Sequence, residues 1–214
     1  LIQNVVSNAK VPVIETGSGI CHLFVNKDAD LQMALNIAEN GKIQRPGVCN
    51  ALECILVHKE IAKEFLPELA KRFNNRVELR ADSSSYEILK NSNIDSAKLV
   101  SATQADYGFE FLDLICTVKI VEDVQEAISY INSHNSKHSE CIITNDRNTA
   151  RLFQTMVDAS CVYVNASTRF TDGGEFGFGA ELGISTQKLH ARGPMGIKVL
   201  TTTKYLIDGD GQIR

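Results

Sequence analysis

The sequence has no long hydrophobic run and no concentration of positive charge. No apolar stretch reaches the ~18 residues that a membrane-spanning helix needs, so we expect no transmembrane segment. Lysine and arginine form no cluster and the net charge is -4, which argues against a nucleic-acid partner. No stretch has the architecture of a signal peptide. We therefore expect a cytoplasmic protein, and the absence of an initial methionine at Leu1 indicates a piece of a longer chain.

The motifs of metal and dinucleotide sites are also missing. The six cysteines include no CxxC pair, and four of them lie in apolar, strand-like runs, which is typical of reduced core thiols rather than of a disulfide framework. No histidine or cysteine cluster has the spacing of metal ligands, so we expect no metal. The Gly17-x-Gly19 pair lacks the third glycine and the following helix of a dinucleotide fingerprint.

What the sequence does contain is an alternation of buried strands and amphipathic helices. With 214 residues, 43% hydrophobic and 22% charged, it is typical of a soluble globular protein. Apolar runs predict strands, and the i, i+3, i+4, i+7 pattern predicts helices between them. The expected strands are at 21–25, 54–57, 77–79, 114–121, 141–143 and 161–164. This order predicts an α/β fold with a mainly parallel sheet flanked by helices.

Three details of the helices can be stated in advance. We expect Asp28 to cap the helix that carries Leu31, Ala34, Leu35 and Ala38. We expect Pro67 to kink the helix near 62–73 or to break its start. The helix at 146–159 should direct four apolar side chains inward, and these are Leu152, Phe153, Met156 and Val157.

The most reactive candidate is Cys49, which follows the Pro46-Gly47 turn and precedes a buried strand. A thiol there can attack a substrate lying over the sheet, and backbone N–H groups of the turn can lower its pKa and bind the resulting oxyanion. The other five cysteines lie in strand-like or apolar settings, where we expect burial to raise the pKa and block access. The alternative from the local sequence is that Cys49 is an inert buried thiol. Ligands of parallel sheets usually bind at the carboxyl ends of the strands. Cys49 precedes its strand and so lies at the amino end, where this rule does not predict a ligand site.

The region after Val164 has a different character. A long glycine-rich loop region follows, and long ordered loops in compact domains are usually functional. Asp208-Gly209 then predicts a hairpin turn in an exposed terminal β-ribbon. Because unpaired ribbon edges need a partner, we expect a homo-oligomer formed through this ribbon.

Four blocks together resemble the γ-glutamyl phosphate reductase family (glutamate-5-semialdehyde dehydrogenases) of the aldehyde dehydrogenase superfamily. They are residues 13–22 (VIETGSGICH), 44–53 (QRPGVCNALE), 165–170 (NASTRF) and 189–194 (LHARGP). The resemblance runs along the whole chain and implies the carboxyl-terminal, catalytic half of such an enzyme. The implied division is the end of a cofactor-binding domain at 1–16, a catalytic thiol domain at 17–195 and an oligomerisation ribbon at 196–214.

The resemblance implies a reductive reaction at Cys49. The family reduces L-glutamyl 5-phosphate with NADPH to glutamate 5-semialdehyde and phosphate through a cysteine thioester, as the second step of proline biosynthesis from glutamate. The resemblance implies NADPH/NADP as the cofactor. It also suggests that the enzyme associates with a glutamate 5-kinase. The NADPH-over-NADH preference and the oligomer size are not implied.

The resemblance also assigns roles to other residues. Glu15 matches the superfamily's general base, or else is a hydrogen-bonded carboxylate beside the turn. Glu110 and Phe111 look like the segment that holds the nicotinamide ribose, with a solvated carboxylate as the alternative. The loop with Asn165, Ser167, Thr168 and Arg169 would anchor the α-carboxylate of the substrate, with a merely structural loop as the alternative.

Some assignments stay open. Arg45 either receives the departing phosphate or is an ordinary surface arginine, and His190 and Arg192 have no assigned role. Two other readings of the whole chain remain at this stage. One is a different acyl-cysteine aldehyde dehydrogenase, and the other is an inert assembly module that relies on the terminal ribbon.

Overall fold

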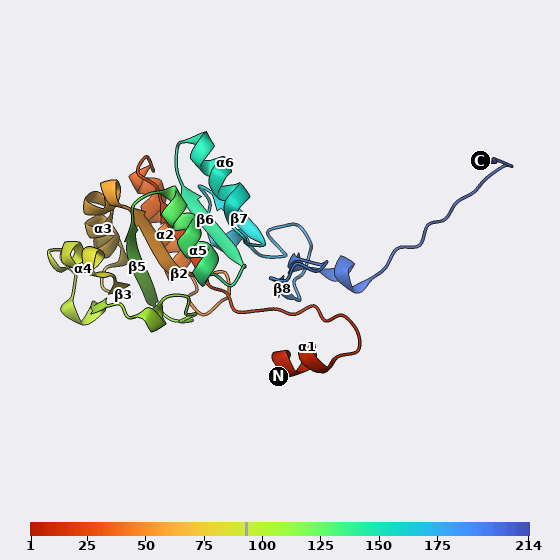
Figure 1. Ribbon diagram of the computed structural model, residues 1–214, viewed down its shortest axis with the longest axis horizontal. Helices are drawn as coiled ribbons and strands as arrows, with labels where there is room; N and C mark the ends of the chain where they lie inside the picture. The colour runs from red at the N-terminus through yellow and green to blue at the C-terminus, as the bar shows by residue number, and fades with distance from the viewer. Residues whose placement is uncertain (93) are drawn as a thin grey trace.

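The computed structural model describes residues 1–92 and 94–214, and its core is one parallel β-sheet (Figure 1). Seven strands lie in the order β4-β3-β5-β2-β1-β6-β7, and each neighbouring pair is parallel. The strands are β1 (Cys21–Val25), β2 (Leu52–His58), β3 (Glu78–Ala81), β4 (Leu99–Ser101), β5 (Ile115–Val121), β6 (Ser139–Ile143) and β7 (Cys161–Val164). The predicted α/β fold is confirmed.

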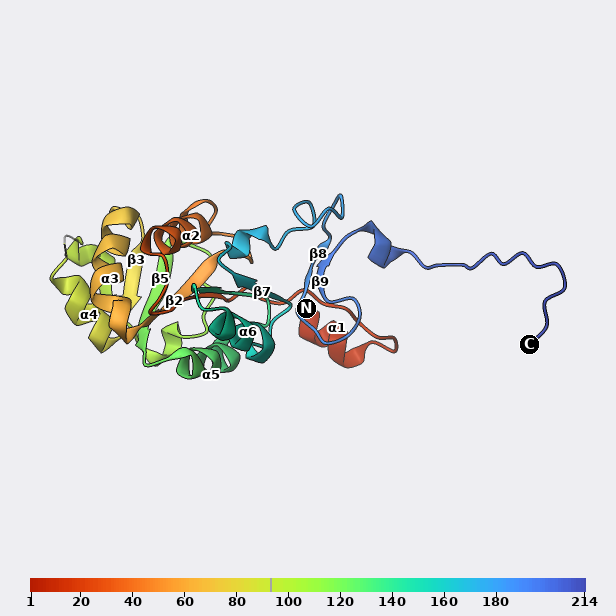
Figure 2. The same cartoon turned by 90° about the horizontal axis from the view of Figure 1, so that it is seen from above.

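Helices cover both faces of this sheet. The α-helices are α1 (Ile2–Asn8), α2 (Leu31–Ile43), α3 (Lys59–Phe73), α4 (Ser83–Lys90), α5 (Val124–His134) and α6 (Arg147–Met156), and the 3-10 turns are η1 (Ser96–Lys98), η2 (Gln104–Asp106), η3 (Thr168–Phe170) and η4 (Ile197–Leu200). Figure 2 shows α2, α3 and α4 on one face and α5 and α6 on the other. None of the helices in the described residues is long and apolar enough to cross a membrane.

Alternating side chains of the central strands fill two separate cores. Leu23 and Val25 pack with the residues of α2 and α3, whereas Phe24 between them packs against Phe153 of α6. All seven residues of β2 are buried, as expected for a strand covered on both faces. Burying one large apolar side chain stabilises a fold by about 1.5–3 kcal/mol. Apolar side chains on both faces of the central strands therefore stabilise their position in the middle of the sheet.

The cap of α2 differs from the prediction. Asp30, not Asp28, is the N-cap, and its carboxylate accepts a hydrogen bond from the Met33 N–H at 2.7 Å. Asp28 instead accepts from Thr144 Oγ1 at 2.7 Å and from the Asn145 N–H at 3.0 Å. It therefore ties the end of β1 to the end of β6, a contact between segments more than 100 residues apart that local pattern does not reveal.

Two other helix predictions hold only in part. The α3 helix runs unbroken from Lys59 through Pro67, so its start is not broken there, and buried side chains on both sides of the proline, including Leu66 and Leu69, offset the ~3 kcal/mol cost of proline in a helix. Of the four side chains predicted to point inward, Phe153 and Val157 are buried, whereas Leu152 and Met156 are exposed. The helix ends at Met156 and covers the sheet margin next to the edge strand β7, where only a narrow apolar stripe finds a partner.

The β-ribbon is present but lies earlier than predicted. β8 (Gly183–Ser185) and β9 (Gly193–Met195) form an antiparallel pair, and Thr16 bridges to Ser185. Residues 201–214 contain no strand, no hairpin forms at Asp208-Gly209, and the segment extends away from the domain (Figure 1). A strand needs a neighbouring edge, and none of the described residues provides one for this tail.

Candidate active site

Cys49 lies at the edge of the sheet formed by the amino ends of the strands. It occupies the connection between α2, which ends at Ile43, and β2, which begins at Leu52. The predicted Pro-Gly turn is present, and a second turn follows in which the Ala51 N–H donates to the Val48 carbonyl at 3.0 Å. The thiol is half-buried, so it is held by the fold yet reachable.

The segment before β1 packs directly onto the Cys49 backbone. A Cβ atom on Gly19 would lie 1.8 Å from the Cys49 carbonyl oxygen, so only glycine fits at this position. The same carbonyl accepts a hydrogen bond from the buried Cys21 Sγ at 3.3 Å. Together these contacts hold the Cys49 turn against the start of the sheet.

Glu110 approaches the same point from the segment before β5. Its Oε1 accepts a hydrogen bond from the Gly19 N–H at 2.6 Å. Burial raises the pKa of the Cys49 thiol, and the carboxylates of Glu181 and Glu110 raise it further. The Cys49 N–H and the Arg169 guanidinium lower it by smaller amounts. The backbone N–H of the turn thus lowers this pKa as predicted, but burial and two carboxylates outweigh it and the pKa is raised overall.

Backbone N–H groups beside the thiol remain free to bind an anion. Among the hydrogen bonds of residues 1–92 and 94–214, none is donated to an oxygen acceptor by the N–H of Cys49 or Asn50. Such N–H groups on a turn are the usual donors of an oxyanion hole.

Asn50 joins the Cys49 turn to the loop that follows β7. Its Nδ2 donates to the Thr171 carbonyl at 2.9 Å, and its own carbonyl accepts from Thr168 Oγ1 at 2.8 Å. The predicted anchor loop and the thiol, 120 residues apart in the sequence, are thus neighbours in the fold.

Two guanidinium groups lie on this side of the thiol. Arg169 is half-buried and its Nε donates to Gln44 Oε1 at 3.1 Å. Burial lowers the pKa of Arg169, and the positive charge of Arg45 lowers it further. Arg45 is exposed. Arg169 and Gln44 also line a polar cavity of about 230 Å³.

Three residues of the predicted anchor loop are engaged within the protein. Asn165 lies at the carboxyl end of β7, where its side chain binds the Thr144 backbone at 3.0 Å through both of its ends, so the structure does not bring it to Cys49. The Ser167 hydroxyl accepts the Arg169 N–H at 3.3 Å. Thr168 is buried and its hydroxyl holds Asn50, which leaves Arg169 as the one member of the predicted set whose charged group faces the cavity.

Glu15 and Phe111 lie near the site without touching the thiol turn. The Glu15 N–H donates to Gln187 Oε1 at 3.1 Å, and within the described residues its carboxylate makes no hydrogen bond. The Phe111 ring packs under the Arg80 guanidinium, 4.9 Å from the ring centroid, and beside Phe109.

Sequence reasoning missed two residues of the site. Asn50, directly after Cys49, was detectable as a polar residue at the start of a buried strand. Glu181 lies in the glycine-rich loop region, where its Oε2 accepts the Gly173 N–H at 2.8 Å, and no local pattern relates it to Cys49.

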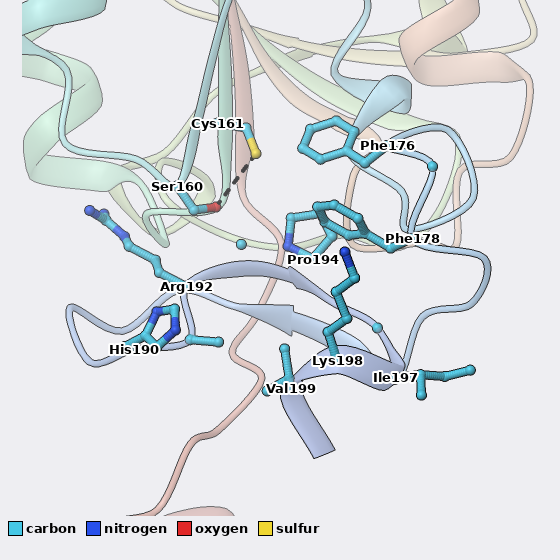
Figure 3. A pocket seen from close by; sticks show the side chains of 14 residues that line it. Ser160, Cys161, Phe176, Phe178, His190, Arg192, Pro194, Ile197, Lys198 and Val199 are labelled. Carbon is cyan, nitrogen blue, oxygen red and sulfur yellow. Dashed lines mark hydrogen bonds between the residues drawn. The ribbon is translucent and has the colours of Figure 1, made fainter. Parts of the chain in front are cut away.

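A larger, more apolar cavity of about 500 Å³ lies elsewhere, between the β8–β9 ribbon, the loop with Phe176 and Phe178, and the start of β7 (Figure 3). It includes His190 and Arg192, and Arg192 also pairs with Asp158 at 3.2 Å. Cys161 lines it and is only half-buried, contrary to the prediction that Cys49 alone is accessible. No residue of the Cys49 turn lines either cavity, but the smaller polar one is lined by Arg169, whose charge acts on the Cys49 thiol.

Comparison with known proteins identifies relatives along the whole chain. No model of a known protein family matches. The γ-glutamyl phosphate reductases of Streptococcus suis and Agathobacter rectalis are 58% and 56% identical to the chain over its full length. The chain spans about half the length of these curated relatives, 50% of each.

Solved structures give the same result. The crystal structure of γ-glutamyl phosphate reductase from Thermotoga maritima matches all of this chain and 50% of its own, with 49% identity and a TM-score of 0.90. An acetylating aldehyde dehydrogenase from Geobacillus thermoglucosidasius shares the fold, with a TM-score of 0.75 at 16% identity over all of this chain and 55% of its own. By sequence and by fold, the chain corresponds to one half of the γ-glutamyl phosphate reductases that it matches.

Proposed function

We propose that the full-length enzyme containing this chain reduces L-glutamyl 5-phosphate to L-glutamate 5-semialdehyde and phosphate, the second step of proline biosynthesis. The observation that carries the proposal is the half-buried Cys49 thiol on a turn with free N–H groups, beside the Arg169 and Arg45 cations. The relatives that match the whole chain carry the name of this activity.

In the proposed reaction the Cys49 thiolate forms a bond to the γ-carbonyl carbon. The carbonyl oxygen becomes an oxyanion, which the N–H groups of Cys49 and Asn50 stabilise. The bond from carbon to the phosphate oxygen then breaks, phosphate leaves, and a thioester remains. Reduction of the thioester and cleavage of its C–S bond release the aldehyde and regenerate the thiol.

The reducing equivalent is a hydride, which NADPH supplies when bound. Glu110 fits the role of holding the nicotinamide ribose, because only its Oε1 is hydrogen-bonded among the described residues and Oε2 remains free for a hydroxyl. An engineered glycolyl-CoA reductase with the same fold has been solved with bound NADP⁺, which supports a nicotinamide cofactor. The choice of NADPH over NADH is part of the proposal, as is a lesser role for Phe111.

The anionic parts of the substrate match the cations beside the thiol. We assign the α-carboxylate to Arg169 and the departing phosphate to Arg45, since charge-assisted contacts to guanidinium groups are the strongest available for these anions. Glu15 has no hydrolytic water to activate in a reaction that releases phosphate, so its role is structural in this proposal.

The proposal extends to the arrangement of the full-length enzyme. Residues 1–16 would complete a cofactor-binding domain, 17–195 form the thiol domain, and 196–214 mediate a homo-oligomer. Association with a glutamate 5-kinase, which makes the acyl phosphate, would protect that reactive substrate from water.

Replacement of the thiol tests the mechanism in the full-length enzyme. Cys49→Ala should abolish semialdehyde formation, and Cys49→Ser should nearly do so, because a hydroxyl without a dedicated base is a far poorer nucleophile. Cys161→Ala is the matched control and should keep normal activity, since Cys161 lines the other cavity. If Cys49→Ala kept more than roughly a few per cent of the activity, the thioester mechanism would be wrong.

A further inference from the structure

We infer that the polar cavity beside Cys49 is a recognition site for the zwitterionic head group of an α-amino acid, in which Asp172 and Glu175 bind the ammonium group. This inference rests on the proposed function and deepens it, because it names the residues that select an amino acid over a simple carboxylic acid.

The cavity carries charges of both signs. It measures about 230 Å³ and is lined by Asn40, Gln44, Arg169, Phe170, Asp172 and Glu175. Asn40 and Gln44 come from the end of α2 and the segment after it, and the other four from η3 and the loop that follows. Gln44 links the cavity to the thiol turn, since it lies five residues before Cys49 and accepts the Arg169 Nε–H.

The opposite charges in this cavity do not neutralise each other. Among the described residues, Arg169 forms no ion pair within 4.0 Å, although two carboxylates line the same cavity. Its only side-chain hydrogen bond goes to the neutral Gln44. Cation and anions held apart around one hollow are complementary to a ligand that itself carries both charges.

The Asp172 carboxylate is held in place by the backbone, whereas Glu175 is exposed at the rim of the cavity. Asp172 Oδ1 accepts the N–H groups of Gly174 at 2.7 Å and of Glu175 at 3.2 Å. Its Oδ2 makes no hydrogen bond in the described part of the chain and is available to an ammonium group. The same turn brings Glu175 to the cavity wall.

The hydroxyl groups of Ser167 and Thr168 are not available to bind the amino-acid head group. The Thr168 O–H is already donated to the Asn50 carbonyl, and the Ser167 hydroxyl, which accepts the Arg169 N–H, is only 5% exposed, so neither is presented to a ligand carboxylate. The carboxylate therefore falls to Arg169. An ammonium group next to that guanidinium would be repelled without a compensating anion, which Asp172 and Glu175 provide.

The test compares two substrates that differ only in the ammonium group. In the full-length enzyme, the double variant Asp172→Asn/Glu175→Gln removes both charges, and the Asn oxygen still accepts the two N–H groups of the turn. For phosphate-dependent oxidation of glutamate 5-semialdehyde, kcat/KM should fall about 10-fold or more, the size of a lost charge-assisted contact. For 5-oxopentanoate, which lacks the ammonium group, kcat/KM should stay within about twofold.

Calorimetry gives a readout that does not depend on turnover. L-glutamate should bind the double variant about 10-fold more weakly than the unmodified enzyme, whereas glutarate should bind both equally. Glu64→Gln, an exposed carboxylate on α3, is the control and should change neither affinity.

The outcomes separate this inference from the proposed function. The ammonium site would be overturned if the double variant lost kcat/KM equally for glutamate 5-semialdehyde and 5-oxopentanoate, or lost affinity equally for L-glutamate and glutarate. Unchanged values would overturn it as well, and either result would leave the reductase proposal intact. If the unmodified enzyme failed to oxidise glutamate 5-semialdehyde, the proposed function would fail, and a selective loss of L-glutamate binding in the double variant would still support the site.

Discussion

Cys49 lies in an electrostatic field of mixed sign. Burial and the carboxylates of Glu181 and Glu110 favour the neutral thiol, and Arg169 favours the thiolate. A nucleophilic thiol has to ionise, so Arg169 has two roles in the proposed reaction. It binds the anionic substrate, and it supports the thiolate that attacks it.

Loss of Arg169 should therefore impair the reaction strongly. In the full-length enzyme, Arg169→Ala should lower kcat/KM by roughly 10- to 100-fold, because a charge-assisted contact is worth about 1.5–3 kcal/mol. Arg151→Ala, an exposed arginine of α6, is the control. An unchanged kcat/KM for phosphate-dependent oxidation of the semialdehyde would remove Arg169 from the site.

Loss of the Glu181 charge should make the thiol more reactive. The thiolate is the charged form, so removing a nearby carboxylate lowers the raised pKa and increases the thiolate fraction at neutral pH. With Glu181→Gln, iodoacetamide at pH 7 should modify Cys49 severalfold faster, and the pH–rate curve should move to lower pH.

Peptide mass spectrometry distinguishes the thiols in that experiment. Cys49 and Cys161 should react, since both are half-buried, and the other four should stay protected. The Cys161 rate serves as the internal control. If the Cys49 rate in Glu181→Gln stayed equal to that of the unmodified enzyme, Glu181 would have no electrostatic influence on the thiol.

At the level of elements, a buried ion pair joins the helix and the strand on either side of the thiol turn. Lys42 in the last turn of α2 and Glu53 in β2 are 2.9 Å apart, with side chains 0% and 1% exposed. Glu53 Oε1 also accepts the Leu112 N–H at 3.3 Å. The pair therefore connects the two elements that flank the Cys49 turn, together with the segment that carries Glu110.

Breaking that pair should destabilise the fold. Burial raises the pKa of Glu53 to about 7 despite Lys42, so without the lysine the carboxylate would be buried and uncompensated. Lys42→Met should cost about 3–5 kcal/mol of unfolding free energy, measured by urea titration. The apolar double variant Lys42→Met/Glu53→Leu should recover part of the loss.

The exposed pair on α3 supplies the control for this prediction. Lys71 lies 3.6 Å from Glu68 with 77% of its side chain exposed, and Lys71→Met should change stability by less than about 1 kcal/mol. If Lys42→Met behaved in the same way as Lys71→Met, the buried pair would not hold the elements around the turn.

At the scale of the whole molecule, both ends of the chain expose apolar side chains. The α1 helix has no buried residue, and Ile2 and Val5 are 49% and 43% exposed. In the tail, Tyr205, Leu206 and Ile207 are between 81% and 88% exposed, and Figure 2 shows the segment extended beyond the ribbon. Apolar surface of this kind is typical of segments that pack against another domain or subunit.

The tail should therefore be needed for assembly. Deleting residues 201–214 from the full-length enzyme should reduce the mass measured by light scattering to that of a smaller species, because the deletion removes the exposed apolar segment that would make the contact between subunits. Tyr205→Ser/Ile207→Ser should weaken assembly in the same direction, and Lys204→Gln is the polar control. An unchanged mass after the deletion would contradict the predicted oligomerisation through the tail.

Much of the fold could be predicted because its determinants are local. The runs at Cys21–Val25 and Leu52–His58 are apolar without interruption, which is characteristic of strands buried on both faces. The predictions failed where the structure of a segment depends on contacts with residues distant in the sequence. Asp28 is hydrogen-bonded to Thr144 rather than capping α2, and among the described residues the tail has no strand edge to pair with.

The sequence by itself determined the elements of this protein and the position of its reactive turn, since hydrophobic period and a Pro-Gly pair act over a few neighbouring residues. Only the tertiary structure decided the environment of that turn. The tertiary fold brings Glu110, Glu181 and Arg169 to Cys49, and it brings Gln44 to the cavity that Arg169 and Asp172 line. Charges act through space rather than along the chain, so the pKa of the thiol and the shape of its ligand site follow from contacts that no local pattern contains.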